Sequence, residues 1–313
     1  MRPARLLLLG SVLVGMAAPA PAQPFETAGA RALGMAGAFV AVADDGTAVY
    51  WNPGALAAGP FFSMLLERGG LERREPGGAG GRSRSATLFA IGTPPLGFAY
   101  YRLRQSEAEG GRLRSLITHH TGAALVQSLL PGLSVGATLK YVRGIAATAP
   151  APTALRGEAL VDAAEDLVGR AGNRFDVDAG VLLAAGRLRL GLTARNLTAP
   201  AFETPSGERL QLRRGARLGA AIVERDRWAV AADLDLASEA GKRLLAVGAE
   251  RWLGRRFAIR GGVRGDVAGA RRDVTFAAGA SAVVRGALWL DAYATRGGRE
   301  EDRGWGVSAR VTF

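Results

Sequence analysis

The sequence predicts an all-β protein, a transmembrane antiparallel β-barrel of about 14 strands whose lumen holds an N-terminal hatch segment. Three observations support this fold class. From Phe61 to Phe313 the chain consists of segments in which apolar and polar residues alternate, and short and long connections take turns between those segments. A glycine-dotted stretch before them fits neither a helix nor a strand pattern.

Residues 1–22 have the composition of a secretory signal peptide. Arg2 and Arg5 form a basic end, Leu6 to Val14 an apolar centre, and residues 20–22 an A-x-A cleavage site. The apolar centre is shorter than the ~20 residues that a membrane helix needs. We therefore expect export of the chain and residence in the bacterial outer membrane, in contact with its lipid.

Residues 23–60 are expected to form the hatch. From Gly29 to Ala57 the chain is small and apolar, and Gly29, Gly34, Gly37 and Gly46 interrupt any long helix or strand. Backbone without regular pairing is tolerated at membrane depth only where protein surrounds it, so we place this stretch in the lumen. Asp44 and Asp45 precede a glycine here, a pattern that favours a turn over a calcium site.

Six side chains of the hatch are expected to line a transport path: Asp44, Asp45, Tyr50, Trp51, Asn52 and Pro53. Asparagine offers two donors and an acceptor, and proline fixes its own φ, so the pair can hold irregular backbone in one shape. The alternative is a helix start or a turn on a surface loop.

Residues 61–313 are expected to form the barrel. In residues 132–141 every odd position is apolar or aromatic, whereas Ser134, Thr138 and Lys140 occupy the other face. The last strand, up to Phe313, alternates in the same way. Segments of this length match a tilted membrane strand.

The connections separate a barrel from a soluble sandwich, which would also alternate. Short and long connections alternate along the chain. The short turns lie near 93–97, 130–132, 185–187, 224–227, 254–256 and 284–286. The longer polar stretches lie near 68–84, 104–114, 143–173, 196–209, 237–242, 265–273 and 295–303. Tight periplasmic turns and long outer loops are typical of outer-membrane barrels.

Aromatic residues fall where a membrane-interface girdle is expected. Trp228, Trp252, Phe257 and Phe313 lie beside short turns, and Trp305 lies beside a long loop. A terminal phenylalanine resembles the signal that the outer-membrane assembly machinery reads, which makes that machinery an expected partner.

A short amphipathic helix is predicted near residues 155–168, in an outer loop. Its apolar face carries Leu160, Ala164, Leu167 and Val168, with acidic residues on the other face. These apolar residues could line a groove for a ligand, or the helix could merely cap the rim and bury its own apolar face.

The sequence offers no catalytic or metal site. There is no cysteine, and the two histidines, His119 and His120, are adjacent on a strand and so point to opposite faces. No nucleotide-binding or serine-hydrolase motif accompanies them. We therefore expect no enzyme activity, no metal and no cofactor.

The net charge does not indicate nucleic-acid binding. The sequence has 40 basic and 28 acidic residues, a net charge of +12. The arginines are scattered along strand ends and turns, which favours loop and lumen charge near an anionic lipid surface.

The glycine-rich stretch at 29–56, GARALGMAGAFVAVADDGTAVYWNPGAL, resembles the N-terminal signature of the FadL-like outer-membrane barrels, and of their PorV/PorQ-type branch in particular. A second similarity lies in DVDAGV at 176–181 and LRLGLTARNL at 188–197. Family members usually carry Asn-Pro-Ala where this chain has Asn52-Pro53-Gly54.

The resemblance implies passive transport of a hydrophobic small molecule, such as a fatty acid, past a displaced hatch. A ligand carboxylate would then favour an inward-facing arginine, for which Arg260 and Arg264 are candidates. The PorV-like alternative is a scaffold that binds partners of a protein secretion system. A structural barrel without transport is the third possibility.

Overall fold

The computed structural model describes residues 28–74, 80–151, 155, 157–236, 243–268, 274–297 and 302–313. The predicted signal peptide, residues 1–22, lies outside the described residues.

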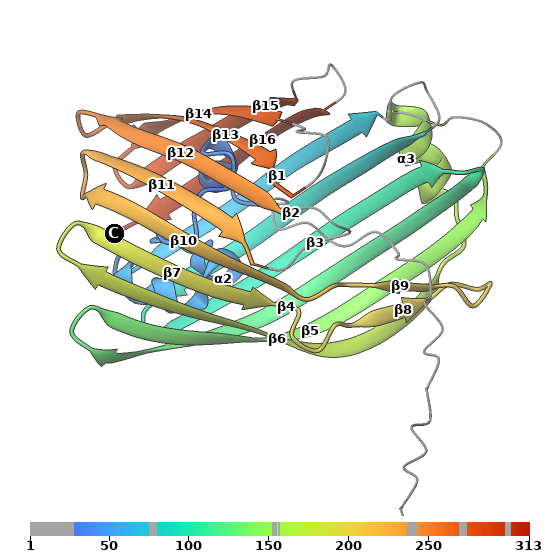
Figure 1. The fold of residues 1–313 in the computed structure, drawn as a ribbon, viewed down its shortest axis with the longest axis horizontal. Helices are drawn as coiled ribbons and strands as arrows, with labels where there is room; N and C mark the ends of the chain where they lie inside the picture. The colour runs from blue at the N-terminus through green and yellow to red at the C-terminus, as the bar shows by residue number, and fades with distance from the viewer. Residues whose placement is uncertain are drawn as a thin grey trace, which may run out of the picture.

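Fourteen strands in the described part of the chain close into one antiparallel barrel, which confirms the predicted fold class (Figure 1). β1 pairs with β16 to close the cylinder, from Ser63 opposite Thr312 onward. The barrel strands are β1 (Ser63–Arg74), β2 (Gly81–Thr93), β3 (Leu96–Glu109), β4 (Arg112–Leu130), β5 (Leu133–Pro150), β6 (Arg170–Ala185), β7 (Leu188–Arg195), β10 (Gly215–Glu224), β11 (Trp228–Asp235), β12 (Leu244–Leu253), β13 (Phe257–Asp266), β14 (Val274–Arg285), β15 (Leu288–Gly297) and β16 (Asp302–Thr312).

The barrel wall is taller on one side than on the other (Figure 1). β4 has 19 residues and β5 has 18, whereas β7 and β11 have 8 each. The extra length of β2–β6 projects at the end of the barrel where the longer connections lie. We call this the loop end, the opposite end the short-turn end, and the part of β2–β6 beyond the shorter strands the tall wall.

Two predicted loops are mostly strand, so those predictions are wrong. The polar stretch 68–84 belongs largely to β1 and β2, and within 104–114 only Gly110 and Gly111, with φ of 59° and 75°, separate β3 from β4. Polar side chains end a strand's contact with lipid, but the backbone ladder continues as long as a neighbour supplies hydrogen-bond partners.

The N-terminal segment lies inside the barrel. It contains α1 (Ala30–Gly34), α2 (Ala48–Trp51) and the 3-10 helix η1 (Pro53–Ala58). α1 contacts β13–β16, α2 contacts β2–β4, and η1 contacts β4–β7. Residues 28–58, which we call the hatch, therefore touch opposite arcs of the wall, as the predicted fold class requires.

Two further elements cover the tall wall. The helix α3 (Gly157–Glu165) packs on its outer face, where Leu160 is buried with Ala108 and Leu113. The hairpin of β8 (Ala201–Glu203) and β9 (Arg209–Gln211) packs on its inner face, where the Phe202 ring covers Gly144.

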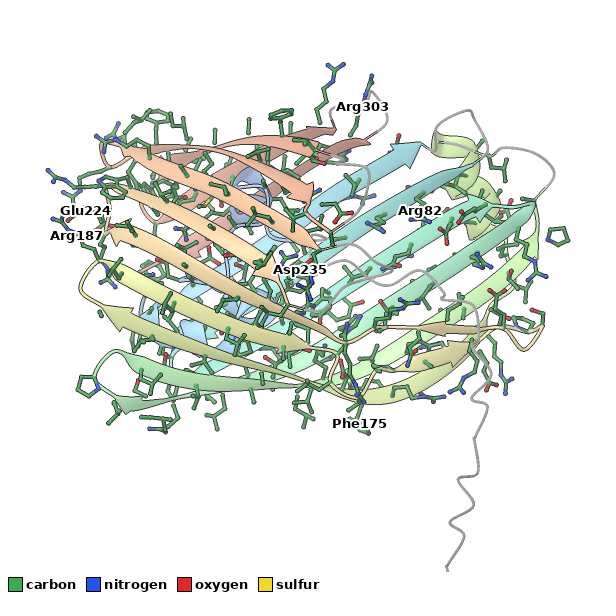
Figure 2. All side chains as sticks on the ribbon, viewed as in Figure 1. Arg82, Phe175, Arg187, Glu224, Asp235 and Arg303 are labelled. Atoms are coloured by element: carbon green, nitrogen blue, oxygen red, sulfur yellow. The ribbon has the colours of Figure 1, made fainter. Side chains whose placement is uncertain are left out.

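The outer face of the barrel is apolar at alternate positions, as a lipid-facing wall requires. Leu188, Leu190 and Leu192 of β7 are all exposed, and Phe175 projects away from the wall of β6 (Figure 2). None of the described helices is long and apolar enough to cross a membrane.

The aromatic girdle is only partly as predicted. Trp305, Phe257 and Phe313 are exposed on the outer face. Trp252 instead faces the lumen, where its ring meets that of Trp289 edge-on at 5.2 Å between centroids. The alternation of apolar and polar residues did not predict the face of Trp252, because Trp252 and its neighbour Leu253, beside the turn, are both apolar.

Candidate functional site

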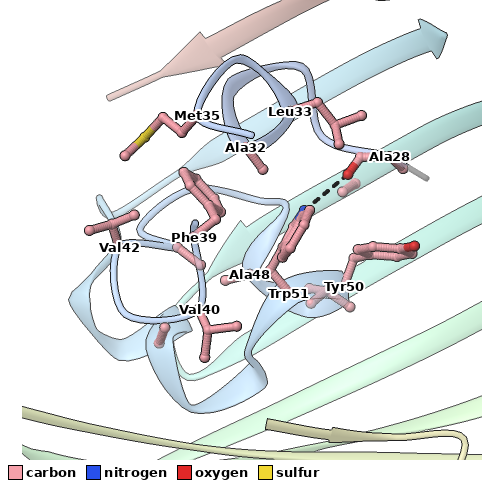
Figure 3. Close-up of a cluster of buried hydrophobic side chains, with 14 of the residues drawn as sticks. Ala28, Ala32, Leu33, Met35, Phe39, Val40, Val42, Ala48, Tyr50 and Trp51 are labelled. Atoms are coloured by element: carbon pink, nitrogen blue, oxygen red, sulfur yellow. Dashed lines mark hydrogen bonds between the residues drawn. The ribbon is translucent and has the colours of Figure 1, made fainter. Parts of the chain in front are cut away.

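The hatch has its own aromatic core (Figure 3). The Trp51 ring meets the rings of Phe39 and Tyr50 edge-on, each at 5.9 Å between centroids. The indole Nε1 of Trp51 donates to the carbonyl oxygen of Ala28 at 3.0 Å. Buried aromatic rings contribute large apolar area, and the satisfied indole N–H removes the cost of burying it. The hatch is therefore a folded plug rather than a loose strand.

Inward-facing glycines of the wall allow the hatch backbone to approach it closely. A Cβ added at Gly136 would lie 2.5 Å from the Pro53 carbonyl carbon, and one at Gly248 would lie 2.4 Å from the Met35 carbonyl oxygen. Similar contacts occur at Gly180, Gly191 and Gly262. The lumen at this level is therefore filled by backbone against backbone, with no room for side chains between.

Asn52 ties three segments together, in the manner expected from its donors and acceptor. Its Nδ2 donates to the carbonyl oxygens of Val40 at 2.9 Å and of Val181 at 3.0 Å, and its Oδ1 accepts from the N–H of Gly54 at 3.0 Å. Asn52 is fully buried, and Pro53 begins η1 beside it. The surface-loop alternative for these residues is wrong.

The glycine in place of the usual alanine also has a physical reason. A Cβ on Gly54 would lie 2.6 Å from the carbonyl oxygen of Gly180 in β6. Gly54 and Gly180 thus form a mutual close approach that a methyl group on either would disrupt.

Two wall carboxylates bind the hatch backbone, and the sequence reasoning missed both. Glu67 of β1 accepts from the N–H groups of Gly29 and Ala30 at 2.6 and 2.5 Å. Asp233 of β11 accepts from those of Phe39 and Val40, both at 2.8 Å. The available signal was an acidic residue at an inward position of a barrel strand. Such carboxylates satisfy N–H groups that irregular backbone leaves unpaired.

Arg31 is the centre of the charged contacts of the hatch. Its guanidinium meets Asp44 at 2.5 Å and Glu250 of β12 at 2.7 Å, with Asp45 at 3.3 Å. Burial alone would lower the pKa of Arg31, but Asp44 and Glu250 outweigh it and raise that pKa well above its ordinary value. Asp45 also accepts from the N–H of Thr47 at 2.9 Å, in agreement with the predicted turn.

Tyr50 lies between the hatch and a buried polar cluster of the wall. The guanidinium of Arg195 lies 3.7 Å from the centroid of the Tyr50 ring, and the Tyr101 ring meets Tyr50 edge-on at 5.3 Å. Behind them Lys140 pairs with Asp176 and Asp178, both at 2.7 Å. This cluster lies where the second sequence similarity, at 176–181, was noted.

The two arginines predicted to meet a ligand carboxylate face the lumen, and Arg260 is already paired with wall carboxylates. Arg260 donates from Nε to Glu250 at 2.5 Å and lies 3.8 Å from Asp291. Arg264 borders a small space beside Leu33 and Tyr293, above the hatch. An incoming carboxylate would have to compete with the internal pairs of Arg260.

A cavity of about 470 Å³ lies below the hatch at the short-turn end. Arg31, Asp44 and Glu250 form its inner limit, and Trp252 and Trp289 line its side. The guanidinium of Arg310 lies 5.4 Å from the Trp289 ring centroid. The volume falls within the range of cavities that hold small organic molecules.

At the loop end an apolar cluster lies between the tall wall and the β8–β9 hairpin: Leu116, Val142, Ala146, Phe202, Leu210 and Leu212. Glu208 beside the hairpin accepts from Nε of Arg114 in β4 at 2.7 Å. The hairpin thus folds over the inner wall above the hatch. It was not foreseen because its strands have only three residues each.

The predicted outer-loop groove residues do not come together in one open surface. Leu160 and Ala164 are buried against the outer face of the tall wall, and Leu167 packs at the edge of the same cluster. Val168 follows the helix and is 87% exposed. This placement corresponds to the capping role that was the alternative for this helix.

The histidines lie on opposite faces, as predicted. His120 faces the lumen and stacks on Tyr101 at 4.3 Å, whereas the Nδ1 of His119 meets the Tyr100 hydroxyl at 2.8 Å on the outer face. Among the described residues no group of three His, Asp or Glu side chains could hold a metal ion.

Solved structures of outer-membrane channels share the fold of this chain. The CymD monoaromatic hydrocarbon channel superposes with a TM-score of 0.68 at 12% identity, over 92% of this chain and 98% of that one. A Pseudomonas aeruginosa FadL homologue gives 0.66 at 14% identity, over 94% and 100%. The P. putida toluene transporter TodX gives 0.65 at 13%, over 93% and 99%.

Sequence comparisons cover less of the chain. The family model described as "F plasmid transfer operon, TraF, protein" matches residues 111–235, from β4 to β11 and under half of the chain. No sequence among the curated proteins matches this one.

Proposed function

We propose that this protein is an outer-membrane barrel that passes hydrophobic small molecules by passive diffusion, past the hatch. The observation that carries this proposal is the position of the hatch: a folded, noncovalently held plug fills the lumen between an apolar cluster at the loop end and a cavity at the short-turn end. The structures with this fold include hydrocarbon channels, which supports the same conclusion.

The proposed route begins under the β8–β9 hairpin. Its inner face is apolar, and a hydrophobic molecule that entered there would replace the contacts of Phe202 and Leu210 with its own. The hatch lies next along the lumen, and the cavity beside Trp252 and Trp289 would receive the molecule below it. Fatty acids and aromatic hydrocarbons are the ligand classes that fit these apolar surfaces.

Movement of the hatch does not require its unfolding. Individual hydrogen bonds such as that from Asn52 to Val181 contribute about 1 kcal/mol each. A displacement that breaks the contacts along one arc of the wall and keeps the aromatic core around Trp51 therefore costs only a few kcal/mol. Such a motion falls in the microsecond to millisecond range of collective changes.

A single engineered disulfide tests this mechanism, because the chain has no cysteine. A Cβ on Gly219 would lie 3.0 Å from the Cβ of Val40, slightly closer than the ~3.5–4.5 Å of a disulfide. It would also lie 2.6 Å from Oδ1 of Asp233, the end of a flexible side chain that must turn aside to admit it. The variant V40C/G219C, once oxidised, ties the hatch to β10. We expect loss of labelled oleate and toluene uptake into vesicles, and recovery on reduction. The single variants V40C and G219C control for the substitutions; full uptake by the oxidised protein would refute a moving hatch.

A scaffold role is the second candidate, and one observation favours it. Wall glycines such as Gly136 and Gly248 meet hatch backbone without space between, so the lumen is densely packed at that level. A PorV-like barrel that holds partners of a protein secretion system would need no open path. In that case the oxidised V40C/G219C variant would still capture its secretion partners in affinity purification.

Export and membrane residence are part of the proposal. We expect the mature protein to begin at Gln23, after cleavage of residues 1–22, and to fractionate with the outer membrane. N-terminal sequencing of the purified protein tests the first expectation, and recovery in a soluble fraction without detergent would contradict the second.

A further inference from the structure

The outer face of the barrel carries three basic side chains on three neighbouring strands. Arg102 of β3 pairs in register with His119 of β4, and His119 pairs with Arg143 of β5. Residues directly opposite on adjacent strands have their Cβ atoms ~4.5–5.5 Å apart. We call Arg102, His119 and Arg143 the outer basic cluster.

These side chains lie outside the lumen. On β4, His120 faces the lumen and stacks on Tyr101. The adjacent residue His119 therefore points to the outer face. Arg143 is exposed, and Arg102 and His119 are half-buried. In the described part of the chain neither Arg102 nor Arg143 forms an ion pair with a carboxylate. The two guanidinium groups thus flank the His119 imidazole with their donors free of carboxylate partners among the described residues.

The cluster lies at the edge of the apolar outer band. On β5 the outward residues from Leu133 to Leu139 are apolar, Tyr141 follows, and Arg143 is next. The nine residues from Leu133 to Tyr141 match the ~9–11 residues of a membrane strand, so Arg143 lies just beyond the lipid chains on the loop side.

Aromatic side chains border the cluster on the side of the apolar band. The Tyr100 hydroxyl meets Nδ1 of His119 at 2.8 Å, and the Tyr141 ring meets that of Phe175 edge-on at 5.6 Å. Aromatic rings at this height are typical of the level of lipid headgroups. An anion bound here would thus have apolar chains directly below it.

We propose that Arg102, His119 and Arg143 form a binding site for the phosphate of a membrane lipid headgroup on the outer surface of the barrel. Arginine binds phosphate through two parallel N–H donors, and two arginines on either side of an imidazole can hold one phosphate from both sides. The site uses no residue of the hatch or lumen, so it depends on membrane residence and not on transport.

Lipid binding to the purified barrel tests the site. The probe is bisphosphorylated lipid A in detergent micelles, with binding measured by native mass spectrometry and by titration. The variant R102S/R143S should bind it at least tenfold more weakly than the unchanged protein. The matched control R251S/R285S removes two outward arginines near the short turns and should leave binding unchanged.

Two further arms identify the source of the phosphate. Inorganic phosphate at the same concentration should not displace lipid A. Dephosphorylated lipid A should bind weakly, and equally weakly to the unchanged protein and to R102S/R143S. Equal lipid A binding by R102S/R143S and the unchanged protein, or displacement by inorganic phosphate, would overturn the proposal. Oleate uptake by R102S/R143S should be normal at equal insertion, which separates this site from the transport proposal.

Discussion

Arg31 of the hatch and Glu250 of β12 are joined by two hydrogen bonds, from Nη2 to Oε1 at 2.7 Å and from Nε to Oε2 at 2.9 Å. The same carboxylate accepts from Nε of Arg260 in the neighbouring strand. One wall carboxylate thus compensates a hatch cation and a wall cation together. This contact holds the hatch against the short strands, at the upper limit of the cavity.

We predict that Glu250→Gln destabilises the barrel by about 3 kcal/mol, because removal of one partner leaves buried charge uncompensated on Arg31 and Arg260. Urea unfolding in detergent micelles, followed by tryptophan fluorescence, measures the change. The control is Glu224→Gln, whose partner Arg187 is 2.6 Å away at the exposed short-turn end, where both residues are labelled in Figure 2. That exposed pair should contribute less than about 1 kcal/mol, and equal losses in the two variants would contradict the prediction.

Gly54→Ala tests the close approach between η1 and β6. The added Cβ would lie 2.6 Å from the Gly180 carbonyl oxygen, so backbone must shift, and we expect a loss of about 1–3 kcal/mol in unfolding free energy. Gly261→Ala is the control, since its Cβ would lie 3.8 Å from the Ala277 carbonyl oxygen, an ordinary van der Waals contact. Equal stability of Gly54→Ala and Gly261→Ala would contradict the close packing of η1 against β6.

The strands and their faces could be predicted because the lipid-facing wall imposes a strict period of two. Lys140 and Ser134 were assigned to the inner face of β5, and both are buried there. The period also separated His119 from His120. The period did not predict the face of Trp252, because two apolar residues adjoin a turn there. It also did not predict where the strands of the tall wall end, because a segment that is polar on both faces can be either strand or loop.

The hatch contacts were less accessible to sequence reasoning. The folding of the segment inside the lumen follows from its composition, but the partners of Arg31 lie 13 and 219 residues away in the chain. No local pattern encodes such pairing. The inward acidic residues Glu67 and Asp233 were a usable signal, because a carboxylate facing a closed lumen needs donors there.

Asp233→Asn should loosen one arc of the hatch. The carboxylate accepts from the N–H groups of Phe39 and Val40, both at 2.8 Å, and a neutral amide forms weaker hydrogen bonds. We expect hydrogen exchange at residues 39 and 40 to accelerate about tenfold, in line with a loss of about 1.4 kcal/mol. Exchange around Trp51 should change less. Asp226→Asn, in an exposed turn, is the control and should leave residues 39 and 40 unaffected.

Phe202→Ala should release the β8–β9 hairpin from the tall wall. The Phe202 ring fills the space left by Gly144 and belongs to the apolar cluster with Leu116 and Val142, so its removal leaves a cavity that costs about 3 kcal/mol. Because β8 contacts β5 and β6 of the tall wall, the loss should fall mainly on the local opening of the hairpin.

Limited trypsin digestion measures that opening, since Arg209, Arg213 and Arg214 lie in or beside the hairpin. When opening is faster than cleavage, the rate follows the open population, so about 3 kcal/mol corresponds to roughly a hundredfold faster cleavage at these arginines. Phe257→Ala, which removes a ring from the lipid-facing side, should not change it. If the hairpin limits entry, oleate uptake should also rise in Phe202→Ala; faster cleavage with unchanged uptake would place the entry elsewhere along the rim.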